Sequence, residues 1–444
     1  MSSATDASSE HLLSKIVESS IKAVKPSAIF ERSFQLSKNR LEAFGNVIDL
    51  GEKGRIRCAA IGKSAEAMAR EVRKRCGDRA TGIIATPVQK RMDVLGFQFF
   101  LSGHPLPDEG SMSAADAVEN MARSAGPDDL LLFLVSGGGS ASIFAPIGGV
   151  TLGQANVLFR LMFDGGVPIG GVNLLRRHLS RLGGGKLARL ASGARKLSLV
   201  ISDVVGDDLP SIASGPTVID KTLPSDALDF LSESGFVDRT PEAIIDALKS
   251  AGDRAQSGEI PDNEVKIVAS NRDALLAAQR CAEESGFNVE VISRFYEGDA
   301  SEAGRLLVSI ARSIETDGLP FQRPAVVLVG GETTVEVQGN GMGGRNQHLV
   351  LTALSEAAKL NGCGMELGHT TFFSFGTDGK DGNSDSAGAS ASLETFRRVE
   401  GGLAELDVFI KRNDSHNFFR KFGGLVTTGP TDTNVMDIFG IIIE

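Results

Sequence analysis

The stretch Leu130-Leu131-Leu132-Phe133-Leu134-Val135-Ser136-Gly137-Gly138-Gly139-Ser140 indicates how the chain folds. A short apolar run such as 130–135 is typical of a strand that is buried on both faces of a parallel sheet. Glycines in the loop that follows allow positive φ and a close approach of the backbone to a ligand, and unpaired N–H groups there attract anions. The stretch therefore predicts an α/β sheet with an anion-binding loop, 136–140, at the carboxyl end of a strand. The alternative is a tight turn that binds nothing.

The same alternation of short apolar runs and helical patterns continues through most of the chain. It predicts βαβ units, mainly parallel sheets and ligands at the carboxyl ends of strands. The polar segment 221–261 separates two series of strands, so we place the domain boundary there. Helices at 11–24 and 28–34 are expected to pack against the first sheet. Further helices are expected at 64–76, 113–123, 274–284 and 302–316. The predicted strands are 56–61, 82–86, 97–101, 130–135 and 197–201, then 265–269, 289–292, 325–329, 334–337, 371–375 and 438–443.

The composition excludes several classes of protein. With 46 basic and 56 acidic residues the net charge is -10, which leaves no overall field for nucleic acid or anionic lipid. Glycine supplies 52 of 444 residues without a triplet period, so the excess belongs to turns and loops. The four cysteines show no metal or disulfide spacing. No apolar run approaches the ~20 residues of a membrane helix. The N-terminus lacks the pattern of a signal peptide, so we expect a reduced, cytoplasmic protein.

Two cations lie beside glycine-rich segments. Lys63 directly follows the predicted strand 56–61, where an ammonium can neutralise a carboxylate or a phosphoryl group; the alternative is an ordinary surface lysine. Arg345 lies in Gly343-Gly344-Arg345-Asn346-Gln347, with no acidic residue close by in the sequence. Its planar guanidinium suits bidentate binding of phosphate or carboxylate. We expect both residues to act in a site that binds a carboxylate or a phosphoryl group.

Carboxylates follow two of the predicted strands. Asp203 and Asp378 come closest to the strand ends, where they could hold Mg²⁺ or accept a proton from a substrate hydroxyl. For Asp208, Asp381 and Asp385 we favour helix capping or turn formation. His104 and His178 are secondary candidates, because either could be a polar loop residue or a helix-packing residue.

Familiar nucleotide motifs are absent. Gly62-Lys63-Ser64 is similar to the end of a P-loop, but Arg57 stands where that motif needs glycine. Gly183-Gly184-Gly185-Lys186 is followed by Leu187 rather than serine or threonine. No GxGxxG follows the first strand, and the GxSxG spacing of an esterase is missing.

Taken together, the motifs resemble those of the class II glycerate kinases, in order and over nearly the whole chain. They are Gly62-Lys63-Ser64, Ser102 to Asp108, Ser136 to Ala141, Ser202 to Asp208, Ile212 to Thr217, Gly330 to Thr334, Gly343 to Gln347, Gly376 to Gly379 and Thr428 to Thr431.

This resemblance implies a two-domain α/β fold with the active site between the domains. A Rossmann-like N-terminal domain, 1–258, would carry a mainly parallel sheet, and a smaller α/β domain with a mixed sheet, 259–444, would close the cleft. It also implies phosphorylation of D-glycerate by ATP with Mg²⁺ or a similar divalent cation. The family's essential lysine and arginine fall on Lys63 and Arg345.

From these positions we expect specific roles for the candidate residues. Gly137 to Ser140, preceded by Ser136, would bind the phosphates of ATP through backbone N–H groups. Lys63 and Arg345 would bind substrate and balance charge on the transferring group, with His104 as a further substrate contact. Asp203 would orient or deprotonate the attacking hydroxyl, and Asp203 and Asp378 are the candidate metal ligands. We expect 2-phosphoglycerate as the product, and a homodimer is the default oligomer.

Three positions depart from the family pattern. Gly183 stands where a basic residue is frequent, His348 where an acidic residue is common and Asp432 where glycine is frequent. They bear on substrate preference and regulation, and Lys186 could replace a contact missing at Gly183. The alternatives are an NAD(P)H-dependent hydroxypyruvate reductase, a kinase that forms 3-phosphoglycerate, and a sensor of small acids without activity.

Overall fold

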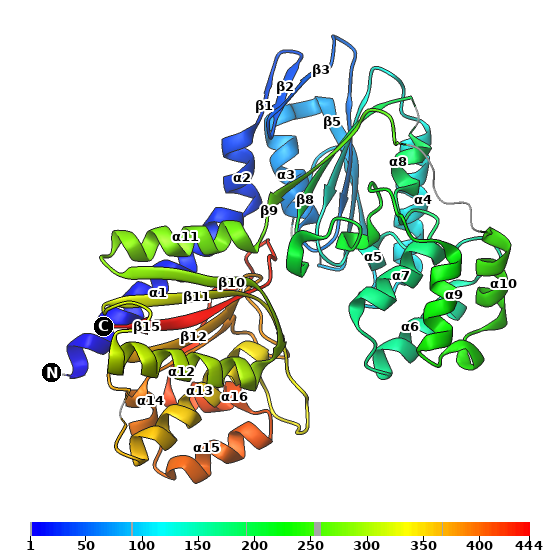
Figure 1. Cartoon of the computed structure of the whole chain (residues 1–444). Coiled ribbons are helices and arrows are strands. Elements are labelled where there is room, and N and C mark those ends of the chain that lie inside the picture. Colours follow the sequence, from blue (N-terminus) through cyan, green and yellow to red (C-terminus); the bar gives the residue numbers. More distant parts are fainter. Residues whose placement is uncertain (1, 90–91, 192, 253–258, 366) are drawn as a thin grey trace. The chain divides into compact units, whose positions relative to one another are not determined.

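The computed structural model describes residues 2–89, 92–191, 193–252, 259–365 and 367–444, and Figure 1 shows its elements. The chain divides into two compact units. The N-terminal unit is Pro26–Val268. The C-terminal unit is Ala269–Glu444 together with the segment that ends at Lys25. This division differs from the predicted one at residue 258, because the first helix joins the C-terminal unit and the strand after residue 262 joins the N-terminal sheet.

The N-terminal unit is built on a sheet of six strands. In spatial order these are β6 (Phe97–Leu101), β5 (Ala80–Thr86), β4 (Ile56–Ile61), β7 (Leu130–Val135), β8 (Arg195–Ile201) and β9 (Asn263–Ala269). Pairs from β6 to β8 are parallel. All six residues of β7 are buried, as a strand covered on both faces requires. Numbered along the chain, the order is that of a Rossmann fold, with its switch point between β4 and β7. The predicted Rossmann-like fold is confirmed.

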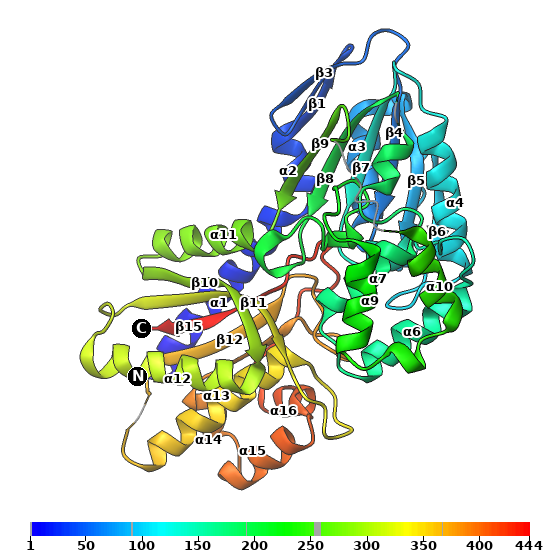
Figure 2. The same cartoon turned by 45° about the vertical axis from the view of Figure 1, so that its right-hand side comes forward.

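Helices cover this sheet and also form a cluster of their own. Within the core of one face, α4 and α8 pack with Ala59, Leu131 and Phe133. A second core lies among α6, α7, α9 and α10, which Figure 2 shows together. The helices of the unit are α2 (Pro26–Ser33), α3 (Ala65–Cys76), α4 (Glu109–Arg123), α5 (Gly139–Ser142), α6 (Leu152–Asp164), α7 (Ile169–Leu179), α8 (Lys186–Leu190), α9 (Pro224–Glu233) and α10 (Glu242–Ala251). Short 3₁₀ turns are Gly77–Arg79, Val205–Asp207, Ile212–Ser214 and Val237–Arg239.

A small antiparallel sheet in the N-terminal unit was not predicted. It consists of β1 (Phe34–Ser37), β2 (Arg40–Ala43) and β3 (Asn46–Asp49). Strands of four residues are too short for an alternating pattern to distinguish them from turns.

The C-terminal unit has a mixed sheet, as predicted. Its order is β10 (Asn288–Asp299), β11 (Ala325–Thr334), β15 (Asp437–Ile443), β12 (Thr370–Gly376), β13 (Gly388–Ala391) and β14 (Leu425–Val426). Only the pairing of β10 with β11 is parallel among those described. The strand predicted at 334–337 is wrong, because β11 ends at Thr334. The helices are α1 (Ser2–Val24), α11 (Asn271–Glu284), α12 (Ala300–Asp317), α13 (Arg345–Gly362), α14 (Leu393–Arg397), α15 (Gly402–Lys411) and α16 (Ser415–Phe422).

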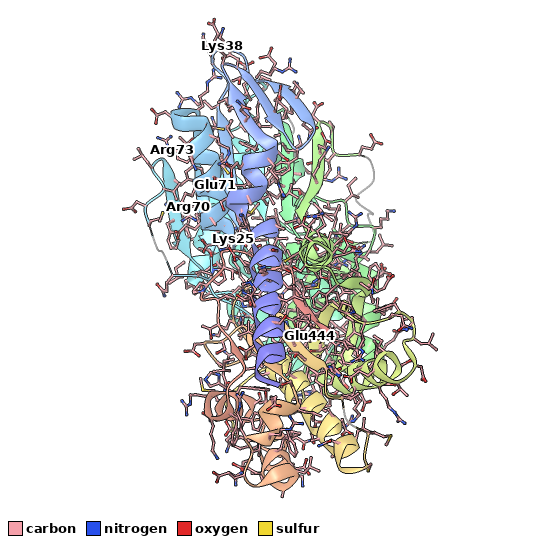
Figure 3. All side chains as sticks on the ribbon, turned by 90° about the vertical axis from the view of Figure 1, so that its left-hand side faces the viewer. Lys25, Lys38, Arg70, Glu71, Arg73 and Glu444 are labelled. Atoms are coloured by element: carbon pink, nitrogen blue, oxygen red, sulfur yellow. The ribbon has the colours of Figure 1, made fainter. Side chains whose placement is uncertain are left out.

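The first helix does not pack against the parallel sheet, and that prediction is wrong. Helix α1 lies along α11, and Thr433 Oγ1 donates a hydrogen bond to Val24 O at 2.9 Å. Figure 3 shows α1 running past Glu444, whose Oε1 accepts a bond from Ser9 Oγ at 2.5 Å. The apolar face of a helix reveals that it is buried but not which surface buries it.

No helix in the described part of the chain is long and apolar enough to span a membrane.

Replacing Ile16 by Ala tests the position of α1. Ile16 is fully buried, so the substitution should lower the free energy of unfolding of the C-terminal unit by about 2–5 kcal/mol. Hydrogen exchange should show faster exchange of the amides of β11 and β15 than in the unsubstituted protein, with β4 and β7 less affected. Lys15→Ala, on the exposed side of the same helix, should stay within about 0.5 kcal/mol. Loss of protection in β4 and β7 alone would contradict this arrangement.

Candidate functional site

Two loops are joined at the carboxyl ends of β4 and β7. Lys63 N donates to Gly137 O at 2.8 Å, and Ser136 N donates to Ile61 O at 2.9 Å. The buried hydroxyl of Ser136 accepts a bond from Ser64 N at 3.0 Å and donates to Ile61 O at 3.1 Å. The segment after β4 and the glycine loop after β7, residues 136–140, are therefore one hydrogen-bonded structure at the switch point of the sheet.

The first two glycines of the loop bring three candidate residues together. A Cβ on Gly137 would lie 1.6 Å from Asp203 Oδ2. Gly138 has φ 80°, and a Cβ there would lie 3.1 Å from His104 Cδ2 and 3.5 Å from Lys63 Cγ. Asp203 and His104 thus approach the backbone where a side chain would stand. The structure places Lys63, His104 and Asp203 at the glycine loop, and their chemical roles remain predictions.

A strained turn supports the other end of the loop. Ala213 and Ser214 have φ of 52° and 59°, a region in which each non-glycine residue costs about 1–3 kcal/mol. A Cβ on Gly139 would lie 2.7 Å from Ala213 Cβ, and Ser214 Oγ donates to Ser140 Oγ at 2.8 Å. The motif 212–217 was noted in the sequence, but no local pattern revealed this packing.

The glycine loop retains unused backbone donors. Gly139 N donates to Ser136 O at 3.3 Å. The N–H groups of Gly137, Gly138 and Ser140 make no hydrogen bond to another residue in the described part of the chain. Donors of this kind at the start of a helix, beside a lysine, can hold the oxygens of a phosphate or carboxylate.

An arginine that sequence reasoning missed lies next to His104. Arg176 on α7 is buried, and its Nη2 donates to Pro105 O at 2.5 Å. Partial burial, together with the positive charges of Lys63 and Arg176, lowers the pKa of His104. The imidazole is therefore neutral at neutral pH and can either donate or accept a hydrogen bond.

Arg345, in the C-terminal unit, has acidic partners that the sequence did not reveal. Its Nε donates to Asp437 Oδ2 at 2.5 Å, its Nη2 to Asp437 Oδ1 at 3.2 Å and its Nη1 to Glu332 Oε1 at 2.6 Å. The sequence around Arg345 holds no acidic residue, and it did not indicate these ion pairs because both partners are distant in the chain. The three bonds fix the plane of the guanidinium and leave two of its five N–H groups for a ligand.

Asp437 is the deeply buried member of this cluster. Burial raises the pKa of Asp437 to about 6, while the charge and hydrogen bonds of Arg345 oppose the shift. For Arg345, burial would lower the pKa, but Asp437 and Glu332 raise it above its ordinary value. Arg345 is charged at neutral pH, so the protonation of Asp437 decides whether the ion pair forms. The ion pair is formed at neutral pH and weakens below about pH 6.

The other carboxylates have structural contacts. The expected capping by Asp381 is confirmed, since it accepts bonds from Asn346 N and Gln347 N at 3.1 and 2.9 Å at the start of α13. Asp208 accepts a bond from Ser211 Oγ at 2.5 Å. Asp378 accepts a bond from Lys380 N at 3.0 Å in a turn. In the described residues, no group of three or more His, Cys, Asp or Glu could hold a metal ion by itself.

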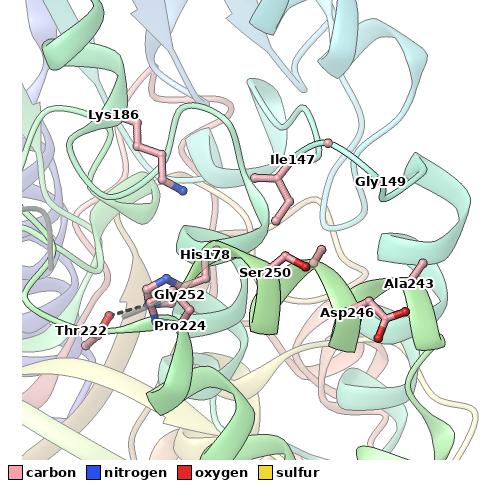
Figure 4. Close-up of a pocket in the computed structure, with 13 residues that line it drawn as sticks. Ile147, Gly149, His178, Lys186, Thr222, Pro224, Ala243, Asp246, Ser250 and Gly252 are labelled. Atoms are coloured by element: carbon pink, nitrogen blue, oxygen red, sulfur yellow. Dashed lines mark hydrogen bonds between the residues drawn. The ribbon is translucent and has the colours of Figure 1, made fainter. Parts of the chain in front are cut away.

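A cavity of about 640 Å³ lies elsewhere in the N-terminal unit (Figure 4). His178 and Lys186 line it, and His178 Nε2 is bonded to Thr222 Oγ1 at 2.9 Å. Lys186 Nζ donates to the carbonyls of Arg177 and Ser180 at 2.8 and 2.7 Å, so it braces the end of α7. Lys63, His104 and Asp203 are not among its lining residues.

The structure shows the surroundings or the backbone conformation of each of the three residues that depart from the family pattern. Gly183 packs on α7, since a Cβ there would lie 3.2 Å from Arg177 Cα. His348 is buried, and its Nε2 lies 3.1 Å from Ser301 Oγ. Asp432 has φ 65°, a conformation that glycine adopts more readily.

Two protein families match different parts of the chain. Residues 12–249 match a family described as "Domain of unknown function (DUF4147)", and residues 325–437 match the MOFRL family. D-glycerate 2-kinase of Thermotoga maritima is 34% identical over 97% of each chain. The crystal structure of a glycerate kinase from Thermotoga maritima has a TM-score of 0.85, at 31% identity, and covers 99% of this chain and 100% of its own. The chain belongs to the class II glycerate kinase family.

One relative carries a different label within this family. A protein of Agrobacterium vitis with the provisional name hydroxypyruvate reductase is 36% identical over 89% of this chain and 90% of its own. Reduction with a nicotinamide cofactor would require a dinucleotide fingerprint after the first strand, and Gly62-Lys63-Ser64 stands there instead. For this member of the glycerate kinase family, the reductase label has no support in the sequence.

Asp437→Asn tests the buried ion pair through the pH dependence of stability. The native carboxyl, with its pKa raised to about 6, binds a proton that the unfolded chain has already released above about pH 4. The free energy of unfolding of the unsubstituted protein, relative to the variant, should therefore fall as pH rises from about 4 to about 6, by at most about 3 kcal/mol. Denaturant titrations across this window measure the difference. Glu332→Gln, which alters a carboxylate that is 42% exposed, is the control. A difference that is flat or rises with pH would contradict the assignment.

Proposed function

We propose that this chain transfers the γ-phosphoryl group of ATP to the 2-hydroxyl of D-glycerate and releases 2-phosphoglycerate and ADP. The observation that carries the proposal is the glycine loop, where unpaired amides gather at the switch point with Lys63, His104 and Asp203. Full-length similarity to a D-glycerate 2-kinase supports D-glycerate as the acceptor and the 2-hydroxyl as the group that is phosphorylated.

The glycine loop takes the phosphates of the nucleotide. The N–H groups of Gly137, Gly138 and Ser140 bind phosphoryl oxygens. The ammonium of Lys63 offsets the negative charge on these oxygens and on the phosphoryl group that is transferred. Transfer of a phosphoryl group depends mainly on positioning and electrostatics, and one placed cation can contribute roughly 10³ to 10⁵ in rate. Arg345 supplies a second cation, whose orientation is fixed by Asp437 and Glu332.

Asp203 has the position needed for the attacking hydroxyl. Its carboxylate lies against Gly137, beside the proposed phosphate site, where it can orient the hydroxyl or accept its proton. His104, which is neutral, donates a hydrogen bond to the substrate.

A divalent cation such as Mg²⁺, when bound, would offset charge on the phosphates. Magnesium is commonly held by one or two carboxylates together with substrate phosphates, so Asp203 beside the loop fits this role. Asp378 is the second proposed ligand. We also propose that the enzyme acts in the cytoplasm and as a homodimer.

Lys63→Met should lower kcat by about 10³-fold or more, because the variant keeps an aliphatic stem beside Gly138 but loses the charge. Arg345→Ala should have an effect of similar size. Lys74→Met, an exposed lysine of the same unit, is the control and should leave kcat unchanged. Coupled detection of ADP measures the rate, and circular dichroism confirms folding. Near-normal turnover of Lys63→Met would contradict its role.

The product distinguishes the alternative functions. With ATP, Mg²⁺ and D-glycerate, phosphorus NMR should show 2-phosphoglycerate and ADP. A signal from 3-phosphoglycerate would overturn the proposed position of attack. Oxidation of NADH by hydroxypyruvate without formation of ADP would favour a reductase, and binding of the acid without turnover of ATP would favour a sensor.

A further inference from the structure

Arg176 is a buried cation without a counter-charge among the described residues. The residue is 5% exposed, and its guanidinium lies over the rings of Phe159 and Phe163, at 5.1 and 5.6 Å from their centres. One hydrogen bond is found, from Nη2 to Pro105 O at 2.5 Å. The Nε atom is buried and has no partner among the described residues.

The neighbouring buried arginine shows what is missing. Arg177 is buried as well, but its Nε forms an ion pair with Asp220 Oδ2 at 2.9 Å. For Arg176 no carboxylate lies within ion-pair distance in the described part of the chain. Burial lowers the pKa of Arg176 to about 10, which still leaves it charged at neutral pH. A buried charge is costly unless it is paired, and two aromatic rings offset only part of that cost.

The position of Arg176 links it to the glycine loop. Its bond to Pro105 O holds the residue that follows His104, and the ring of His104 stands against Gly138 beside Lys63. Lys63 and Arg176 both act electrostatically on His104. The unpaired charge is thus close to one candidate substrate contact, although nothing in the sequence around Arg176 indicates this.

We propose that Arg176 and His104 form an oxyanion subsite of the kinase, in which the bound anion supplies the missing counter-charge. The subsite would take the carboxylate of the acceptor acid or a phosphoryl oxygen of the nucleotide. The chemistry is the same for both sources, and the experiment below separates them. This inference rests on the proposed kinase function.

Arg176→Met in the full-length chain is the test. Methionine keeps an unbranched apolar stem against Phe159 and Phe163 but removes the charge. Calorimetric titration measures binding of two charged ligands and their neutral counterparts: D-glycerate with D-glyceramide, and ATP with adenosine. We expect the affinity for one charged ligand to fall at least tenfold while its neutral counterpart binds as before. Weaker binding of D-glycerate would identify the substrate carboxylate as the anion that Arg176 binds. Weaker binding of ATP would identify a phosphate of the nucleotide instead.

Stability provides a second measurement that needs no ligand. Removal of an unpaired buried charge should leave the Tm unchanged or raise it by a few degrees, whereas loss of a purely structural brace would lower it. Arg160→Met, an exposed arginine on α6, is the matched control and should change neither binding nor Tm. Equal weakening of charged and neutral ligands, no change in any affinity, or a clearly lowered Tm would each overturn the inference. If the unsubstituted protein formed no phosphoglycerate, the kinase proposal would fail. The comparison of charged with neutral ligands and the Tm would still test whether Arg176 binds an anion.

Discussion

The hydrogen bonds between the loops after β4 and β7 are the constraint on which the N-terminal site depends. Lys63 N bonds to Gly137 O, and the hydroxyl of Ser136 joins Ser64 N to Ile61 O. These bonds use amides of the β4 loop, whereas three amides of the β7 loop have no partner in the part of the chain that the structure describes. At a switch point the following helices leave on opposite sides of the sheet, so a crevice opens where these two loops meet. The proposed chemistry of the site depends on this difference, because one loop is held in place and the other keeps amides that can bind an anion.

The arginines of the two units differ in how far their charge is paired with carboxylates, and this difference separates a structural role from a functional one. Arg177 is neutralised by Asp220, and it lies within the helical cluster. Arg345 is held by Asp437 and Glu332 but keeps donors for a ligand. Arg176 has a carbonyl and two aromatic rings but no carboxylate among the described residues. Because a buried cation is stable only with compensation, the degree of pairing predicts where an anion from outside the protein would bind.

Much of the fold could be predicted because buried parallel strands leave a strong signal. The run at β7 is apolar throughout, the run at β4 is interrupted only by Arg57, and a glycine follows each within two residues, so their position and their carboxyl ends were clear. The weaker elements failed for physical reasons. Strands of four residues, β1 to β3, carry no measurable period. The apolar face of α1 could not tell which of two cores it covers, and β9 could not be assigned to its sheet, since β-sheet pairing is a choice among distant partners.

The sequence by itself determined the glycine loop and Lys63 in the N-terminal unit and Arg345 in the C-terminal unit, because each stands directly beside a strand end or a helix start, where local geometry fixes position. Only the tertiary structure decided which side chains lie around each of them. Asp203 and His104 reach Gly137 and Gly138 from other segments, and Asp437 approaches Arg345 from 92 residues away. Arg176 stands in an ordinary helical pattern, and only the three-dimensional structure reveals that no described carboxylate lies close enough to pair with it. Electrostatic pairing depends on distance and burial, which the order of residues along the chain does not record.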